Sequence, residues 1–341
     1  MSATSTGLST HAALNGANEQ PLLEVRNLQT HFFLRRGVVK AVDGVSFHVH
    51  AGEVLGLVGE SGCGKSITAL SLLRLLPKAA ARTVGGEILL NGENLLDKSA
   101  REMREIRGRD IAMVLQDPQT SLNPVFTIGN QLREAIAKQH PGSRKSLTER
   151  AIAMLKEVRL AAPEQRVEQF PHQLSGGMKQ RVVGAIAMSC KPQLLIADEP
   201  TTALDVTIQL QYLNLLKSLQ RSLGMALLFI THDFGVVARM CDRVAVMYAG
   251  RIVETGPVRE IFERPAHPYT QGLIASVPAM TQTPERLPTI EGQPPVLTDM
   301  PAGCRFVSRC AYADQRCVER YPETSPLSDQ HSAACWRVQS S

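Results

Sequence analysis

The residues best suited to chemistry in this sequence form a short glycine-rich stretch, GESGCGKS, at 59–66. It satisfies the pattern G-x-x-x-x-G-K-S/T and lies between an apolar run typical of a buried strand, GEVLGLVG, and a run with helical spacing, ITALSLLRLLP, which Pro77 ends. Glycines let successive N–H groups curl around phosphates, Lys65 can reach the β- and γ-oxygens, and Ser66 can offer its hydroxyl to Mg²⁺. We therefore expect a phosphate-binding loop, a P-loop, rather than a turn that binds nothing.

Two adjacent acids end the run LLIADEP later in the chain. At the end of a strand, Asp198 can hold the Mg²⁺ shell and Glu199 can polarise an attacking water as general base, a role worth roughly 10²–10⁴-fold in rate. Taken alone, the motif could also be two acids that merely end a strand, and the P-loop favours the catalytic interpretation. Gln116 in VLQDP and His232 in FITHD are weaker signals singly, but their order along the chain supports them.

A second glycine pair, in LSGGMKQR, also resembles a loop that opens a helix and presents backbone amides to an anion. The P-loop lies far away in the sequence. The motif therefore raises the question of which anion it binds.

The bulk composition is that of a globular protein. With 341 residues, 43% of them apolar, the chain is long enough for one large or two ordinary domains. No run approaches the roughly 18 apolar residues of a membrane span, and residues 1–20 lack the features of a signal peptide, so we expect a disordered tail on a cytosolic protein. The net charge of +5 is dispersed and aromatic residues make up only 4%, which argues against a nucleic-acid binder.

The elements that must position these residues follow from the pattern of apolar residues and turns. Residues 22–58 alternate short β-like runs with turns, and Asn91-Gly92 between two apolar runs indicates a hairpin. Residues 130–190 lack these β-strand signals, and their pattern predicts helices. PQLLIADEP and MALLFITHD indicate two buried strands whose polar ends lie where ligands collect in open α/β sheets, and RVAVMYAGRIVETG indicates a closing hairpin. Prolines become frequent beyond about residue 263, which predicts a boundary and an extension there.

Taken together, the motifs have the order and spacing of an ABC-type ATPase. The resemblance covers about residues 22–263 and rests, in chain order, on the P-loop, Gln116, LSGGMKQR, LLIADEP, TALD (Thr202 to Asp205) and His232. It implies an α/β fold, with a P-loop RecA-like ATPase core, an antiparallel β subdomain and a helical signature subdomain. The expected division is a tail at 1–20, a nucleotide-binding domain at 21–263 with its helical part at about 117–185, and a C-terminal, cysteine-bound extension at 264–341.

The resemblance implies which anion the second glycine pair, in LSGGMKQR, binds. It implies that Ser175, Gly176 and Gly177 bind the γ-phosphate of an ATP held by the P-loop of a partner subunit, so that two chains enclose two ATP molecules head to tail. Met178 stands where the family usually has Gln, a departure shared by one subclass that leaves the backbone and hydroxyl groups in place. Phe32 stands where the family stacks an aromatic ring on adenine; a core phenylalanine is the alternative.

By the same resemblance, the site residues fall into three sets. The catalytic set is Lys65, Gln116, Glu199 and His232. The nucleotide-binding set is Phe32, Gly59, Glu60, Ser61, Gly62, Cys63, Gly64, Lys65, Ser66, Ile67, Ser175, Gly176, Gly177 and Asp205. The Mg²⁺ set is Ser66, Gln116 and Asp198.

Two segments resemble one branch of the family. DPQTSLNPVFTIGNQL, after Gln116, looks like the segment with which peptide-importer ATPases grip their membrane subunits. RPAHPYTQGLIASVP is similar to the His-Pro-Tyr element of oligopeptide, dipeptide and nickel importer subunits, and GGMKQR resembles one of the two non-identical ATPases in those systems. The implied partners are a second homologous ATPase in a heterodimer, two transmembrane permease subunits and, through them, an extracytoplasmic solute-binding protein, with no nucleic acid.

The implied function is ATP hydrolysis that powers peptide import by a peripheral subunit on the cytoplasmic face of the cell membrane. ATP closes the dimer, closure moves the permeases, and hydrolysis with product release reopens it. A nickel or other small-solute importer and a non-transport ABC ATPase are the alternatives. Against the latter, only 57 residues separate Gln116 from Leu174, without the sustained heptads of a coiled coil. A regulatory iron–sulfur protein that uses ATP binding as a switch would not need both Glu199 and His232.

Four of the seven cysteines lie near the C-terminal end with the spacing C-x₅-C-x₆-C-x₁₇-C. Four thiolates suit a soft metal group, either tetrahedral Zn²⁺ or an iron–sulfur cluster, and the spacing is longer than in structural zinc sites. Importer subunits with this cysteine tail hold a 4Fe-4S cluster, and the resemblance transfers that role to Cys304, Cys310, Cys317 and Cys335. Zinc and disulfides are the alternatives, although a cytosolic chain should stay reduced.

Three arginines interleave with these cysteines: Arg305, Arg309 and Arg316. They could offset the negative charge of a cluster. A solvated basic face is the alternative.

Overall fold

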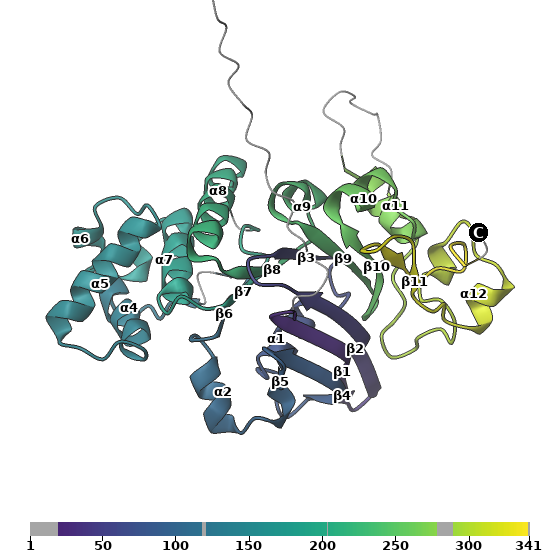
Figure 1. The fold of residues 1–341 in the computed structure, drawn as a ribbon, viewed down its shortest axis with the longest axis horizontal. Helices are drawn as coiled ribbons and strands as arrows, with labels where there is room; N and C mark the ends of the chain where they lie inside the picture. The colour runs from purple at the N-terminus through teal and green to yellow at the C-terminus, as the bar shows by residue number, and fades with distance from the viewer. Residues whose placement is uncertain (1–19, 118–120, 203, 278–288, 340–341) are drawn as a thin grey trace, which may run out of the picture.

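The computed structural model describes residues 20–117, 121–202, 204–277 and 289–339 of the chain. Two sheets form the body of the molecule, and Figure 1 shows how the helices surround them. Apart from Gln20, the tail expected at 1–20 lies outside the described residues.

The larger sheet carries the strands that were expected to end in functional residues. Five neighbouring strands, β9-β3-β8-β7-β6, are parallel, and β10, β12 and β11 continue the sheet antiparallel beyond β9. The runs PQLLIADEP and MALLFITHD form β7 and β8, which pair directly, so that prediction is confirmed. The strands of this sheet are β3 (Val54–Val58), β6 (Ile111–Val114), β7 (Leu194–Asp198), β8 (Ala226–Thr231), β9 (Arg243–Tyr248), β10 (Arg251–Pro257), β11 (Ser325–Pro326) and β12 (Ser332–Ala333).

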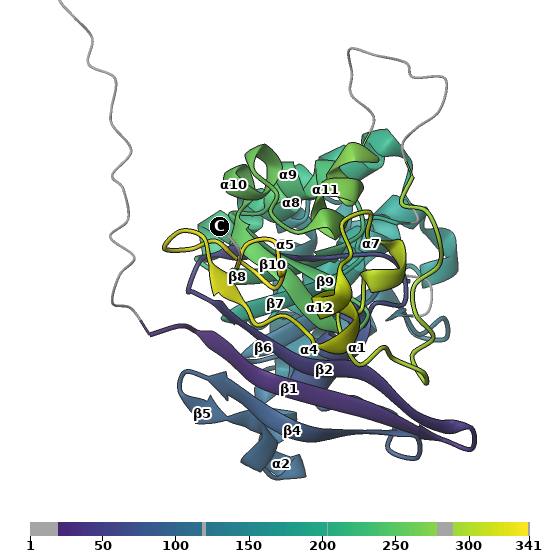
Figure 2. The same ribbon diagram turned by 90° about the vertical axis from the view of Figure 1, so that its right-hand side faces the viewer.

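The smaller sheet is antiparallel, in the order β2-β1-β4-β5. Its strands are β1 (Leu23–Leu34), β2 (Gly37–Val49), β4 (Ala81–Leu90) and β5 (Glu93–Asn94). Figure 2 shows β1 and β2 running side by side as long strands, where short runs were expected. Irregularities in their pairing allow this, because a bulge bends a strand without ending it. The predicted hairpin is confirmed: Asn91 and Gly92 have φ of 50° and 83°, as a two-residue type I′ turn requires.

Helix α1 (Lys65–Leu72) lies between the two sheets and contacts β1, β2 and β7. It ends before Pro77, where the sequence predicted its end. Arg74 adopts a φ of 51°, and the Leu75 N–H donates to the Leu70 carbonyl at 2.9 Å. This left-handed termination stops the helix several residues before the proline can act.

Helices α7, α9 and α10 contact strands of the larger sheet, whereas α2 lies next to the smaller sheet (Figure 1). Helices α4 to α7 lie together beyond β6 (Figure 1). They confirm the prediction that residues 130–190 are mainly helical. The domain limits stay predictions. The helices are α2 (Ala100–Ile106), α4 (Ile128–Ala137), α5 (Arg144–Glu157), α6 (Pro163–Arg166), α7 (Gly176–Met188), α8 (Val206–Leu223), α9 (Phe234–Met240), α10 (Val258–Glu263), α11 (Pro268–Ala275) and α12 (Gln315–Glu319). Short 3₁₀ turns are η1 (Leu95–Asp97), η2 (Pro171–Gln173) and η3 (Val307–Arg309).

The central strands are buried on both faces, which explains their continuous apolar runs. In β3, Val54 and Val58 belong to the core shared with the helices, whereas Leu55 and Leu57 belong to the core between the two sheets. In a strand buried on both faces, every apolar side chain stabilises the folded state by leaving water. Its sequence therefore shows no alternation of apolar and polar residues. Such a strand also holds its carboxyl end rigidly, and the P-loop follows directly after β3.

The extension beyond residue 263 packs on the core through ionic, hydrogen-bonded and aromatic contacts. Strand β12 pairs with β10 of the larger sheet, and His331 Nε2 lies 2.8 Å from the buried Glu254 carboxylate. The Phe306 ring lies 5.3 Å from that of Tyr248, in β9. The extension was expected to be bound by its cysteines; these other contacts are what attach it in the described structure.

Replacing Leu57 with Ala should lower the free energy of unfolding by about 2–5 kcal/mol, because it leaves a cavity between the two sheets. Urea unfolding followed by circular dichroism measures this. Leu34→Ala is the matched control, since Leu34 is 49% exposed, and it should change little. Equal losses in both variants would contradict this placement of the core.

Candidate active site

The P-loop has a shape that only glycine permits at two positions. Gly59 and Gly64 have φ of 154° and 111°, and a Cβ would lie 2.1 Å from the Met247 carbonyl oxygen and 2.4 Å from that of Ala41, respectively. Gly64 is also the N-cap of α1 and makes no side-chain capping bond. The loop therefore passes close against its neighbours and opens directly into a helix N-terminus, the arrangement that binds phosphate.

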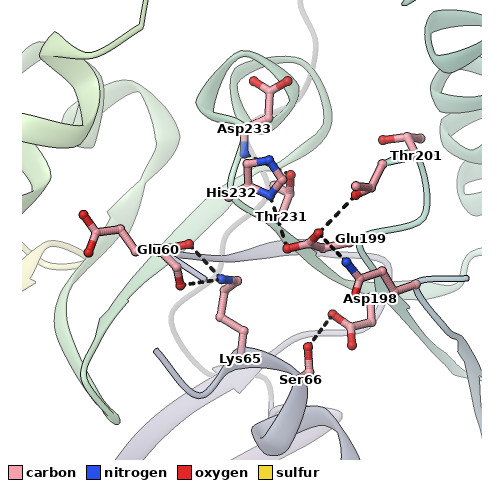
Figure 3. A network of polar contacts seen from close by, with 12 residues as sticks. Glu60, Lys65, Ser66, Asp198, Glu199, Thr201, Thr231, His232 and Asp233 are labelled. Atoms are coloured by element: carbon pink, nitrogen blue, oxygen red, sulfur yellow. Dashed lines mark hydrogen bonds and ion pairs between the residues drawn. The ribbon is translucent and has the colours of Figure 1, made fainter. Parts of the chain in front are cut away.

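Lys65 lies within this loop. Its ammonium donates to the carbonyl oxygens of Gly59 at 2.7 Å and Glu60 at 3.0 Å, and the side chain is almost fully buried. Figure 3 shows the lysine between the loop and the ends of the neighbouring strands. A cation held there can meet the β- and γ-oxygens of a bound nucleotide.

Ser66 and Asp198 meet on the other side of Lys65. The Ser66 hydroxyl donates to the Asp198 carboxylate at 3.1 Å (Figure 3). Burial raises the pKa of Asp198 despite this hydrogen bond. A divalent cation beside the carboxylate would favour its ionised form, and a hydroxyl with a carboxylate is an oxygen donor set that suits Mg²⁺.

Glu199 is held by side chains that follow three different strands. Its carboxylate accepts hydrogen bonds from Gln116, after β6, at 3.0 Å and from Thr202 at 3.1 Å, and lies 3.2 Å from His232 Nδ1, after β8. The Glu199 side chain is 13% exposed and that of His232 is 58% exposed. Glu199 also adopts a φ of 44°, an uncommon backbone conformation of the kind found at functional sites.

One cavity of about 620 Å³ joins most of the predicted residues. Its lining from the predicted sets is Phe32, Gly59, Glu60, Ser61, Gly62, Gly64, Lys65, Ser66, Ile67, Gln116, Glu199 and His232. Cys63 is buried and packs into the core between the sheets, and Asp198 is buried behind Ser66. The parallel strands β3, β6, β7 and β8 all end at this cavity, which is where an open α/β sheet binds its ligand.

The second glycine motif lies apart from that cavity. Ser175 is the N-cap of α7 and its hydroxyl accepts from the Met178 N–H at 3.4 Å, while Asp205 is the N-cap of α8. Among the described residues that line the P-loop cavity, none is Ser175, Gly176, Gly177 or Asp205. Ser175 and Gly176 are exposed. Their role at a partner's nucleotide stays a prediction.

Sequence reasoning missed the part that the extension plays in this site. Leu273 of α11 and Leu297 line the cavity, and Arg309 pairs with Glu60 of the P-loop. Tyr269 belongs to the recognised His-Pro-Tyr element, and its hydroxyl accepts from the Glu60 N–H at 2.9 Å. No local pattern signals these contacts, because the residues lie more than 200 positions from the P-loop.

The four C-terminal cysteines line one common pocket, with Phe306 and Trp336 among its walls. Burial raises the pKa of the Cys304 thiol to about 11, and the three other thiols add to this effect. All seven cysteines of the chain, each of which the structure describes, are free. Yet within the described ranges no three His, Cys, Asp or Glu side chains are placed so that they could hold one metal ion. The expected cluster site is therefore not formed as a ligand set.

Comparison with known proteins decides the family. Residues 42–202 match the family described as ABC transporter, and residues 253–317 match the C-terminal region of oligopeptide/dipeptide transporters. A probable peptide ABC transporter ATP-binding protein of Sinorhizobium fredii is 55% identical over 93% of this chain and 95% of its own length. The chain belongs to the ATP-binding proteins of peptide ABC transporters.

Other relatives of this ABC ATPase agree. A dipeptide transport ATP-binding protein of Bacillus subtilis is 48% identical, over 93% of this chain and 95% of its own. A dimeric ATP-binding cassette solved in a post-hydrolysis state with ADP and phosphate has a TM-score of 0.62 and 28% identity, over 70% of this chain and 99% of that one. The α/β fold expected for an ABC ATPase is thus confirmed, and the protein is an ATPase. None of the helices in the described part of the chain is long and apolar enough to cross a membrane.

Glu199→Gln should slow ATP hydrolysis by about 10²–10⁴-fold, because the amide cannot take a proton from water, while ATP binding persists. Phosphate release and ATP affinity of the purified chain measure the two effects. The control is Glu263→Gln, an exposed carboxylate on α10. Near-normal turnover of Glu199→Gln would remove Glu199 as the base.

Proposed function

We propose that this ATPase powers the import of peptides as a peripheral subunit on the cytoplasmic face of the cell membrane. The observation that carries the proposal is the oligopeptide/dipeptide transporter region at residues 253–317. On the same chain the P-loop, Gln116, Glu199 and His232 line one nucleotide cavity. Relatives named for peptide and dipeptide transport support peptides as the cargo. Nickel or another small solute is the alternative cargo.

The predicted site residues have distinct roles in nucleotide binding and hydrolysis. Lys65 binds the β- and γ-oxygens, and the P-loop amides and Phe32 bind the rest of the nucleotide. Ser66, Gln116 and Asp198 would hold Mg²⁺, which when bound neutralises charge on the phosphates. The hydrogen bond from Gln116 to Glu199 supports these assignments, because Glu199 directly follows Asp198 in the chain.

Hydrolysis itself requires a water in line with the terminal phosphoryl group. The water oxygen forms a bond to the γ-phosphorus, its proton passes to Glu199, and the bond to the bridging oxygen of ADP breaks. His232, 3.2 Å from the Glu199 carboxylate, orients that carboxylate and the phosphate. The products are ADP and inorganic phosphate.

The second half of each ATP site comes from a partner in this proposal. Ser175, Gly176 and Gly177 would bind the γ-phosphate on the partner's P-loop, with Asp205 in the same interface. Their exposure at the N-terminus of α7, outside the chain's own cavity, supports this role. The partner is a second, homologous ATPase subunit, so the working unit is a heterodimer.

Two transmembrane permease subunits, and an extracytoplasmic solute-binding protein on their far side, complete the proposed transporter. The segment after Gln116 is the proposed permease contact. Val125 and Phe126 support it, because both are large apolar side chains left exposed on this segment. We place the nucleotide-binding domain at 21–263, its helical subdomain at about 117–185, and the extension at 264–341.

The four C-terminal cysteines are proposed to hold a 4Fe-4S cluster, with zinc as the alternative. Their donor chemistry fits: four free thiols from separate segments face one pocket with aromatic walls. Burial raises the pKa values of the thiols at Cys304, Cys317 and Cys335. A metal group bound by these cysteines as thiolates would lower them. Ligation would draw these segments together.

Purification of the chain with Glu199→Gln from native membranes, in mild detergent with ATP, tests the transporter. Recovery of a second ATPase and two multi-span proteins is the expected result, and peptide binding by the associated solute-binding protein would identify the cargo. Recovery of soluble partners alone would contradict the proposed function, and a binding protein that takes nickel instead of peptides would change the cargo.

Anaerobically purified protein should contain about four iron and four sulfide per chain and be brown. Cys317→Ser should lose that iron and colour, whereas Cys190→Ser, a buried cysteine far from the pocket in sequence and outside its lining, should keep them. Iron and sulfide analysis and visible absorbance measure this. Colourless protein with stoichiometric zinc, or with no metal, would end the cluster proposal.

A further inference from the structure

The P-loop is held from outside by the C-terminal extension. Arg309, in η3, pairs with Glu60 through two parallel bonds, Nη1 to Oε2 at 2.8 Å and Nη2 to Oε1 at 3.0 Å. The Arg309 side chain is 3% exposed and that of Glu60 is 27% exposed. A bidentate pair fixes the geometry of both groups, and because the arginine is buried, the pair is screened less than an exposed surface pair.

Arg309 is itself fixed by further partners. Its guanidinium also donates to the carbonyl oxygens of Ile290 at 3.1 Å and Glu291 at 3.0 Å, and to the Tyr248 hydroxyl at 3.4 Å. All three guanidinium nitrogens donate hydrogen bonds, so the position of the arginine side chain is fixed. Glu60 therefore has one defined position.

The backbone of Glu60 is held as well. Its N–H donates to the hydroxyl of the buried Tyr269, and its carbonyl accepts from Lys65 at 3.0 Å. The same residue thus connects the phosphate-binding lysine with two residues of the extension. Leu273 and Leu297 bring the extension into the lining of the nucleotide cavity itself.

The charge of Glu60 gives this contact a function. Glu60 lines the cavity that binds a triphosphate, and a free carboxylate there would repel the ligand. Figure 3 shows the Glu60 side chain directed away from Lys65, and Arg309 is the cation that it meets. Arg309 therefore both turns the carboxylate away from the phosphates and compensates its charge.

We propose that the C-terminal extension completes the ATP-binding site, with Arg309 as the positioning residue that holds Glu60 and neutralises it beside the triphosphate. The inference rests on the ATP binding in the proposed function and is independent of the transported solute. It makes the extension a part of the nucleotide site in addition to any contact with a permease.

The test is the affinity of the purified full chain for a non-hydrolysable ATP analogue with Mg²⁺, at low and high salt. Arg309→Gln should weaken binding about tenfold at low salt and less at high salt, because an uncompensated charge is screened. Adding Glu60→Gln to Arg309→Gln removes that charge and should recover most of the affinity. Arg309→Lys should fall between the wild type and Arg309→Gln.

Arg259→Gln is the matched control, because Arg259 forms an exposed pair with Glu263 on α10, and its affinity should equal that of the wild type. Thermal unfolding of each variant separates binding from loss of fold. Unchanged affinity in Arg309→Gln would overturn the proposal. So would a double variant as weak as Arg309→Gln, since the loss would then come from packing and not from charge. A wild-type chain that bound no nucleotide would instead contradict the ATPase function on which the proposal rests.

Discussion

The close approach of the P-loop backbone to its neighbours is the constraint on which the site depends. At Gly59 and Gly64 a side chain would collide with the carbonyl oxygens of Met247 and Ala41, at the end of β9 and in β2. The loop is therefore wedged between the two sheets, and its shape is set by how they pack. This packing also fixes the positions of Lys65 and Ser66, because they are the first residues of the helix that follows the loop.

The parallel sheet brings the other reacting groups to the same place. Strands β6, β7 and β8 end together, so Gln116, Glu199 and His232 meet although they are distant in sequence. Glu199 has a positive φ, and its carboxylate contacts both Gln116 and His232. A rigid, doubly buried sheet thus supports a strained residue at its edge, where its chemistry is required.

Much of this arrangement could be predicted from the sequence, for local physical reasons. A strand buried on both faces must be apolar throughout, which identified β3, β7 and β8, and a glycine loop between strand and helix identified the P-loop. The turn at Asn91-Gly92 follows from the φ values that it needs. The early end of α1 at Arg74 could not be predicted, because an arginine in the left-handed region has no sequence signature. Nor could the pairing of Arg309 with Glu60, which is a tertiary contact between distant segments.

The most direct test of the account is the structure of the transporter with Glu199→Gln, ATP and Mg²⁺, determined by electron cryo-microscopy. The account predicts an ATP in the cavity of this chain, with Lys65 on its phosphates and Glu199→Gln beside the γ-phosphate. It also predicts that Ser175 and Gly176 face a second ATP, held by the partner subunit. An ATP bound elsewhere, or a Ser175 segment that faces only solvent in the closed complex, would contradict it.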